Sequence, residues 1–137
     1  MNEKVRDGTA LQCECKAEEI VLLPCSGASN CGQIANQVAV KLTEDGYGTM
    51  YCLAGIGAHD SAMIEKAKAA NRIVAIDGCS ILCAKRTLEH AGLRVTDHFN
   101  VNKEGIKKVH DFKFSLREIS LIAAKVRERL RQAIISG

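Results

Sequence analysis

Hydrophobic and polar residues repeat with two different periods along the chain, and these periods predict strands and helices in alternation. The short apolar run Ile20–Pro24 (IVLLP) is typical of a strand that is buried on both faces. Residues 30–44 place apolar side chains at helical spacing, and Asn30 with Gln33 resembles a capping box at the start of this helix. Gly46 lies just beyond its end. Together these signals predict a first strand–helix unit.

The same alternation continues to residue 101. The expected elements are a strand at 48–53, a loop at 54–60, a helix from 60 or 61 to about 70, a strand at 72–76, a helix from about 80 to 91 and a strand at 95–101. Residues 102–114 show no clear period, so a loop or a short helix is expected there. Ser115 with Glu118 makes a capping box for a last helix, whose apolar stripe runs from Ile119 to Ile134.

Strands that alternate with helices across short loops are joined by right-handed crossovers into a parallel sheet. The expected fold class is therefore α/β: a three-layer helix–sheet–helix sandwich with a mainly parallel sheet of about four strands. The 137 residues fit one hydrophobic core, and residues 20–137 are expected to form a single domain. Residues 1–19 are polar without periodicity, and a flexible N-terminal tail is expected there.

The composition excludes several classes of protein. Apolar residues make up 47% and charged residues 26%, a balance typical of a soluble globular protein. No apolar run approaches the roughly 18 residues of a membrane helix, and the N-terminus lacks the apolar middle of a secretion signal. We therefore expect a cytoplasmic protein without membrane contact.

The charge distribution argues against nucleic-acid binding. The net charge is only +3 with both signs interspersed, and aromatic residues make up 4% with no tryptophan to stack on bases. One basic cluster stands out and is interpreted as a solvated face rather than a phosphate-binding site. It consists of Lys103, Lys107, Lys108 and Lys113.

Seven cysteines are the unusual feature of the composition, and without an export signal they favour metal binding or redox chemistry over structural disulfides. Cys25, Cys52 and Cys79 are 27 residues apart, the length of one strand–helix unit, so each falls at the carboxyl end of a successive strand. That edge of a parallel sheet is where ligands bind. Cys83 lies one helical turn after Cys79, and this spacing predicts that both lie on the same helical face. Four such thiolates suit a tetrahedral soft-metal site such as zinc, although any one of them alone would be read as a core cysteine.

Three further cysteines have less defined roles. Cys31 lies at the first turn of a helix, six residues after Cys25, where it could join the same centre or form a disulfide with Cys25. Cys13 and Cys15 lie in the polar tail, where incidental exposed thiols are favoured over a metal-capturing arm.

Two residues near the expected site are additional candidates. His59 could be a further metal ligand, a proton carrier or a surface residue, and a lone histidine favours the surface. Asp77, at a strand end, could orient a ligand or cap the following helix, and the cap is favoured. The loop Ser26–Asn30 opens a helix and could bind a small molecule or an anion through its backbone N–H groups. The oligomeric state has no signal in the sequence.

The segments LLPCSGASNCGQIAN, MYCLAGIGAHD and AIDGCSILCAKRTLEHAGL stand in an order and spacing that resemble the DGC domain family, named for the tripeptide at Asp77-Gly78-Cys79. The resemblance covers about Ile20 to Val101. It implies a zinc site but no particular reaction or biological role. Cys31 departs from the family's pattern, which leaves open a five-cysteine centre. The four zinc ligands that the resemblance implies are Cys25, Cys52, Cys79 and Cys83.

Other thiol functions compete with zinc binding. A redox or sulfur-transfer enzyme could use Cys25 or Cys79 as its nucleophile, although the chain has no C-x-x-C pair. An iron–sulfur cluster is also compatible with four thiolates. A cysteine-dependent phosphatase or arsenate reductase is excluded, because the arginine that clamps the oxyanion six positions after the nucleophile is replaced by Cys31.

Overall fold

The computed structural model of the protein describes residues 19–136, so residues 1–18 of the expected N-terminal tail, with Cys13 and Cys15, lie outside the described residues. Four strands form one sheet in the order β2-β1-β3-β4, and every neighbouring pair is parallel. The predicted parallel sheet of about four strands is therefore confirmed. The strands are β1 (Ile20–Pro24), β2 (Thr49–Met50), β3 (Arg72–Asp77) and β4 (Asp97–Asn100).

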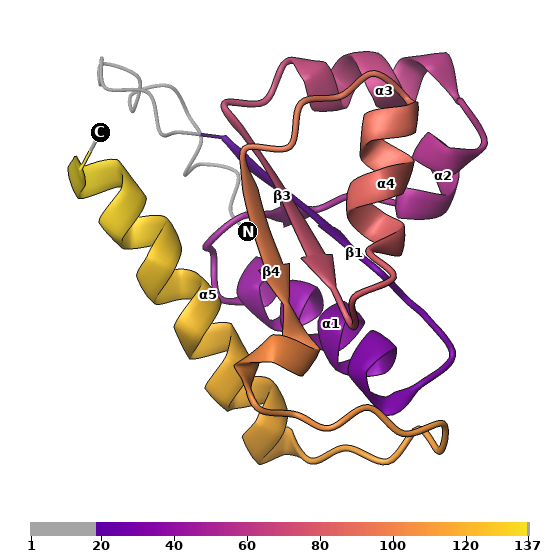
Figure 1. The fold of residues 1–137 in the computed structure, drawn as a ribbon. Helices are drawn as coiled ribbons and strands as arrows, with labels where there is room; N and C mark the ends of the chain where they lie inside the picture. The colour runs from indigo at the N-terminus through magenta and orange to yellow at the C-terminus, as the bar shows by residue number, and fades with distance from the viewer. Residues whose placement is uncertain (1–18, 137) are drawn as a thin grey trace.

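The helices cover both faces of the sheet, which gives the predicted three-layer sandwich (Figure 1). They are α1 (Asn30–Glu44), α2 (Leu53–Gly57), α3 (Ser61–Lys68), α4 (Cys83–His90) and α5 (Leu116–Ser136), with a 3₁₀ turn η3 at Val101–Glu104. One face packs on α1 and α5 through Leu22, Val74 and Ile76 of the strands. The opposite face packs on α2, α3 and α4 through Val21, Leu23, Ile73 and Ala75. None of these helices, within residues 19–136, has the length and apolar character needed to span a bilayer.

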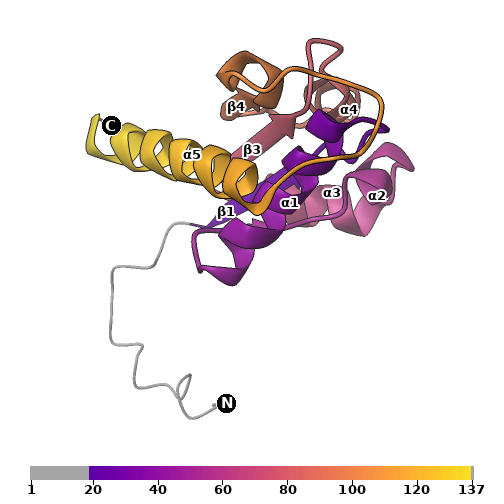
Figure 2. The same cartoon turned by 90° about the horizontal axis from the view of Figure 1, so that it is seen from below.

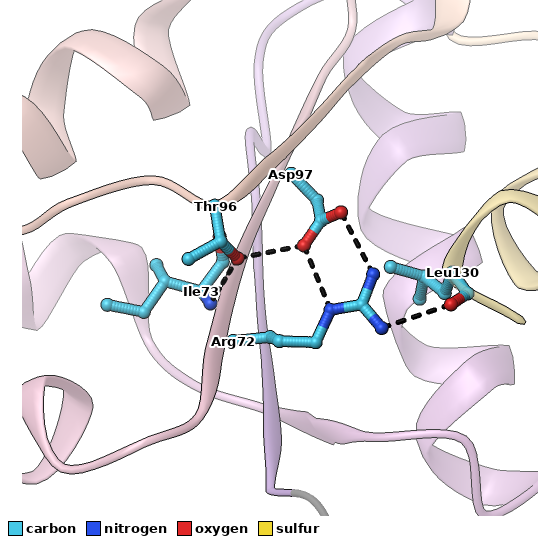
Figure 3. Close-up of polar contacts among 5 residues, drawn as sticks. All are labelled: Arg72, Ile73, Thr96, Asp97 and Leu130. Atoms are coloured by element: carbon cyan, nitrogen blue, oxygen red, sulfur yellow. Dashed lines mark hydrogen bonds and ion pairs between the residues drawn. The ribbon is translucent and has the colours of Figure 1, made fainter. Parts of the chain in front are cut away.

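Arg72 ties the amino-terminal end of β3 to the last helix (Figure 3). Its guanidinium donates to both carboxylate oxygens of Asp97, from Nε at 3.1 Å and from Nη2 at 2.9 Å. Its Nη1 donates to the carbonyl oxygen of Leu130 in α5 at 3.0 Å. Thr96 braces the same carboxylate from its hydroxyl at 2.8 Å. Because Arg72 is only 7% exposed, this clamp joins β3, β4 and α5 inside the protein rather than on its surface.

Some predicted boundaries are wrong, and local hydrogen bonds explain the differences. The expected loop at 54–60 contains the short helix α2, and the strand expected at 48–53 is paired only at Thr49–Met50. The helix expected from about residue 80 begins at Cys83, because residues 80–82 form a turn that ends with Leu82 in the left-handed region at φ 60°. Helix α1 has the predicted range, but its cap is Ser29, whose hydroxyl accepts from the N–H of Gly32 at 3.1 Å.

The capping box of the last helix is confirmed. The N–H of Ser115 donates to the Glu118 carboxylate at 2.9 Å, and the N–H of Glu118 donates to the Ser115 hydroxyl at 3.1 Å. The apolar stripe of α5 is buried as predicted from Ile119 to Leu130. Between η3 and α5, residues 105–115 form an irregular strap that passes over the start of α1 (Figure 2).

Candidate functional site

The carboxyl ends of β1 and β3 lie side by side at the centre of the sheet. Their pairing runs to Pro24 opposite Ile76, and the N–H of Cys25 donates to the Ile76 carbonyl at 2.8 Å. From β1 the chain turns to α1 on one face, whereas from β3 it turns to α4 on the other face. The edge between two strands whose connections leave on opposite faces is where open parallel sheets bind ligands. Cys25 and the tripeptide at residues 77–79 flank this position.

Cys25 is 9% exposed, and its sulfur is held in a cradle of backbone N–H groups. Burial raises the pKa of its thiol, and backbone hydrogen bonds from Gly78 and Gly27 partly offset that effect. The electrostatic effects of Asp77 and Cys83 raise the pKa further. At neutral pH the Cys25 thiol is therefore protonated, which counts against Cys25 as a free thiolate nucleophile.

Three glycines let the backbones at this edge touch directly. A Cβ on Gly78 would lie 2.7 Å from the N of Gly32 and 2.8 Å from the carbonyl carbon of Cys31. A Cβ on Gly32 would lie 2.7 Å from the backbone of Gly27. These contacts leave no room for a side chain, so the loop after β1, the start of α1 and the end of β3 are locked together. The close approach places the cysteines of the two strand ends around one small region.

Asp77 holds the start of α4 from the end of β3. Its Oδ1 accepts from the N–H of Ala84 at 2.6 Å, and its Oδ2 accepts from the N–H of Lys85 at 3.1 Å. His98 on β4 places Nε2 at 2.9 Å from the same Oδ2. Asp77 is 1% exposed, and its carboxylate oxygens are directed at these partners. The capping role expected for Asp77 is thus observed, and it fixes the helix turn that carries Cys83.

The turn between Cys79 and Cys83 is strained at one residue. The N–H of Leu82 donates to the carbonyl of Cys79 at 3.2 Å, and Leu82 itself has φ 60° and ψ 44°. A bulky L-residue in this region costs about 1 kcal/mol or more. The turn leaves Cys79 half-buried and Cys83 exposed on the first turn of α4. The two thiols therefore do not share one helical face, contrary to the spacing argument.

The strap (residues 105–115) closes the other side of the site, and Asn30 anchors it. The side-chain N–H₂ of Asn30 donates to the Lys107 carbonyl at 2.9 Å, and its Oδ1 accepts from the N–H of Val109 at 2.7 Å. The backbone N–H of Asn30 donates to the Val109 carbonyl at 3.1 Å. Asn30 is 6% exposed. Its side chain therefore does not cap α1, as the sequence suggested, but positions the strap.

Two cysteines contact neighbouring positions of this strap. The ammonium Nζ of Lys108 donates to Sγ of Cys79 at 3.4 Å. The thiol of Cys31, which is fully buried, donates to the carbonyl of Ile106 at 3.5 Å. Burial raises the pKa of Cys31, the charge of Cys79 raises it further, and Lys108 partly offsets both. Lys108 therefore contacts a cysteine, whereas the sequence had placed it on a solvated face.

Cys52 stands at the N-cap of α2 and is exposed. It lines a cavity of about 460 Å³ at the carboxyl edge of the sheet, between β1, β2 and α4. Pro24 and Ser26, the two neighbours of Cys25 in the chain, line the same cavity. Cys52 thus lines the same hollow as the two chain neighbours of Cys25.

His59 lies away from the cysteines. It is exposed with φ 61°, and its ring stands edge-on to His90 with centroids 5.3 Å apart. The two rings and Arg86 line a separate cavity of about 310 Å³ beside α4. The surface position expected for a lone histidine is what the structure has.

The donor set suits a soft metal in its chemistry but is not assembled in its positions. Across residues 19–136, no three His, Cys, Asp or Glu side chains are gathered closely enough to hold a metal ion. Cys83 acts electrostatically on the Cys25 thiol, Cys79 acts on the Cys31 thiol, and Cys52 is the N-cap of α2. Binding of an anion at the loop Ser26–Asn30 stays a prediction. One backbone N–H group of this loop already has a partner within the loop, since the N–H of Ser29 donates to the Gly27 carbonyl.

Sequence reasoning missed Lys108, His98 and the anchoring role of Asn30. A lysine in an aperiodic segment carries no signal of its partner, which lies 29 positions away in the chain. His98 lies within an expected strand, where nothing distinguishes it from a surface residue. For Asn30, the signal was present but was assigned to helix capping.

Comparison with known proteins gives one family match and one curated relative. The family model of the DGC domain matches residues 21–126. A protein of Pseudomonas aeruginosa (strain PAO1) named "Anaerobic and virulence modulator AnvM" is 34% identical over 84 residues, 61% of this chain and 64% of the relative. The match thus spans less than two thirds of the relative's own length. No solved structure matches the chain.

Proposed function

The chain belongs to the DGC domain family, and we propose that it is a regulatory protein that binds zinc through Cys25, Cys52, Cys79 and Cys83. The observation that carries this proposal is the position of Cys25 at the sheet edge. Its sulfur accepts hydrogen bonds from the backbone N–H groups of Gly27 and Gly78 while burial keeps the thiol protonated. Donors of this kind stabilise a metal-bound thiolate. The positive charge of a bound cation offsets the cost of a buried negative charge, so the thiol can lose its proton when the metal binds.

The remaining ligands come from segments that have room to move. Cys83 is exposed on the first turn of α4 and acts electrostatically on the Cys25 thiol, and Cys79 opens the turn that ends at the strained Leu82. Cys52 faces the hollow that the neighbours of Cys25 line. Binding therefore requires local closure of residues 51–53 and 79–83, which the described arrangement does not yet have. Closure of this kind couples metal binding to the order of α2 and α4.

A regulatory role agrees with the name of the relative, which describes it as a modulator. Four thiolates leave no open coordination position for water, so hydrolytic chemistry does not follow from such a site. A protein that exchanges metal through exposed ligands such as Cys52 and Cys83 is suited to respond to metal supply or to oxidation of its thiols.

The proposal is tested by elemental analysis of tag-free protein that has been purified anaerobically, with free thiols titrated on the same sample. About one zinc per chain and four shielded thiols are expected. Cys→Ser variants at positions 25, 52, 79 and 83 should each lower the zinc content, and Cys13→Ser and Cys15→Ser serve as controls that should not. Equal zinc content in all six variants would refute the proposal. Iron in the sample, together with a brown absorption band, would instead identify the centre as an iron–sulfur cluster.

A further inference from the structure

Cys31 and Cys79 lie in the same region of the protein, and the proposed zinc site gives Cys31 no role. Cys31 is fully buried in the first turn of α1, and Cys79 is half-buried after the end of β3. The residue before Cys79 packs against the backbone of Cys31, since a Cβ on Gly78 would lie 2.8 Å from the Cys31 carbonyl carbon. The two cysteines also contact strap residues only two positions apart, Ile106 and Lys108. The two thiols are thus held in one compartment.

The two thiols differ in a way that suits two different roles. Cys79 reaches solvent and has the Lys108 ammonium 3.4 Å from its sulfur. An ammonium at this place stabilises negative charge that develops on the sulfur or on an oxygen that leaves it. Cys31 is shielded from solvent, so a dissolved oxidant cannot reach it before it reaches Cys79. A partly exposed thiol next to an ammonium, with a protected thiol nearby, is the arrangement of an attacking and a resolving cysteine.

We propose that Cys79 reduces a hydroperoxide and that Cys31 resolves the product into a Cys31–Cys79 disulfide under the strap. In the first step the sulfur of Cys79 attacks the terminal oxygen of the hydroperoxide. The S–O bond forms as the O–O bond breaks, and the departing alkoxide takes up a proton and leaves as an alcohol, or as water when the oxidant is hydrogen peroxide. In the second step the sulfur of Cys31 attacks the sulfenic sulfur of Cys79. The S–S bond forms, the S–O bond breaks, and the oxygen leaves as water with the Cys31 proton.

The electrons balance without a further reactant. Two thiols lose two electrons and two protons in total, and the hydroperoxide is reduced to one alcohol and one water. This chemistry goes beyond the proposed zinc site but shares Cys79 with it, so that disulfide formation would remove one ligand from that site. The inference itself does not require the metal.

The test uses the full chain in metal-free form, so that it stays separate from zinc binding. Reduced protein receives an equimolar amount of hydrogen peroxide, is alkylated, and is mapped by peptide mass spectrometry. The expected product is one peptide pair that joins Cys31 to Cys79 and is released by dithiothreitol. The same mapping in a Cys13→Ser/Cys15→Ser variant should give the same pair. A link from Cys79 to Cys83 or to Cys25, or sulfinic acid at Cys79 in place of a disulfide, would overturn the inference.

Two variants add kinetic controls. Lys108→Met should slow disulfide formation by roughly two- to fivefold, the effect expected of one partly exposed charge contact, whereas Lys107→Met, with an exposed side chain on the same strap, should leave the rate unchanged. Cys31→Ala should stop at sulfenic acid on Cys79, which a dimedone probe detects. Because Cys31 is buried and its replacement can destabilise the fold, the mapping in the unaltered chain decides on its own. A protein that lacks zinc but forms this disulfide would refute the proposed function and leave this inference standing.

Discussion

Replacing Asp77 by alanine should destabilise the protein far more than removal of an ordinary helix cap. The Asp77 carboxylate is 1% exposed and serves three partners: the N–H groups of Ala84 and Lys85, and Nε2 of His98. In Asp77→Ala the first turn of α4 loses its cap, and the hydrogen-bonding groups that contacted the carboxylate are left without a partner at a buried position. The matched control is Asp60→Ala, because Asp60 caps α3 through a single exposed bond to the N–H of Met63 at 2.9 Å.

The magnitudes follow from the number and burial of the bonds. An exposed cap contributes about 1 kcal/mol, which is the loss expected for Asp60→Ala. Each buried donor left without an acceptor costs about 1–3 kcal/mol, so Asp77→Ala should lose about 3–4 kcal/mol. Asp77→Asn keeps one acceptor for Ala84 and should fall between the two, at about 2 kcal/mol. A loss of this size is a large part of the free energy of unfolding of a typical domain, which is roughly 5–15 kcal/mol.

The assay is urea denaturation followed by far-ultraviolet circular dichroism, in chelator and reductant so that metal and disulfides do not contribute. The midpoint of Asp77→Ala should shift well below that of Asp60→Ala with unchanged slope. If Asp77→Ala costs no more than Asp60→Ala, Asp77 is not the buried anchor of α4. The placement of Cys83 by the end of β3 would then have no support.

Three further changes test other parts of the structure by the same assay. Arg72→Lys should lower the free energy of unfolding by about 2 kcal/mol, because an ammonium cannot make both hydrogen bonds to the Asp97 carboxylate. An unchanged urea midpoint would show that the contact of Arg72 with Asp97 does not stabilise the fold. Gly78→Ala should cost about 1–3 kcal/mol or more, since its Cβ would lie 2.7 Å from the backbone of α1; full stability would show that the backbones do not touch. Metal-free protein should also lose stability as the pH rises above the ordinary thiol value of 9.0. The unfolded state releases the Cys25 and Cys31 protons there, while the folded state, with raised pKa values, still holds them. The pKa of Tyr51 is also raised from its ordinary value of 10.0, so Tyr51 adds a fall in stability at higher pH. A flat wild-type profile between pH 9.0 and 10.0, or an equal fall over that interval in Cys25→Ala/Cys31→Ala, would contradict the reasoning.

The elements with a strong period could be predicted from the sequence, and those set by tertiary contacts could not. β1, α1 and the start of α5 have the expected bounds, because an apolar run, a helical stripe or a capping box fixes each of them locally. α4 starts three residues later than expected because its cap, Asp77, lies six residues upstream on β3 rather than at the helix start. No helix pattern within residues 80–91 could carry that information.

The candidate site also has features that local sequence patterns predict and features that depend on tertiary contacts. Placement of Cys25 and Cys79 at neighbouring strand ends followed from the 27-residue spacing and the parallel sheet, and the structure has both there. The contact of Lys108 with Cys79 could not be predicted, because it depends on how Asn30 pins an aperiodic strap. Spacing also suggested one helical face for Cys79 and Cys83, but the left-handed Leu82 separates them. Convergence of four sulfur atoms therefore remains a prediction, which a metal would have to complete.

X-ray absorption at the zinc edge, on anaerobically prepared protein loaded with one equivalent of zinc, tests that prediction most directly. Four sulfur neighbours at about 2.3 Å, falling to three in Cys52→Ser, are the result expected of the four-cysteine site. A first shell dominated by nitrogen or oxygen at about 2.0–2.1 Å would contradict it. So would a four-sulfur shell that Cys52→Ser leaves unchanged.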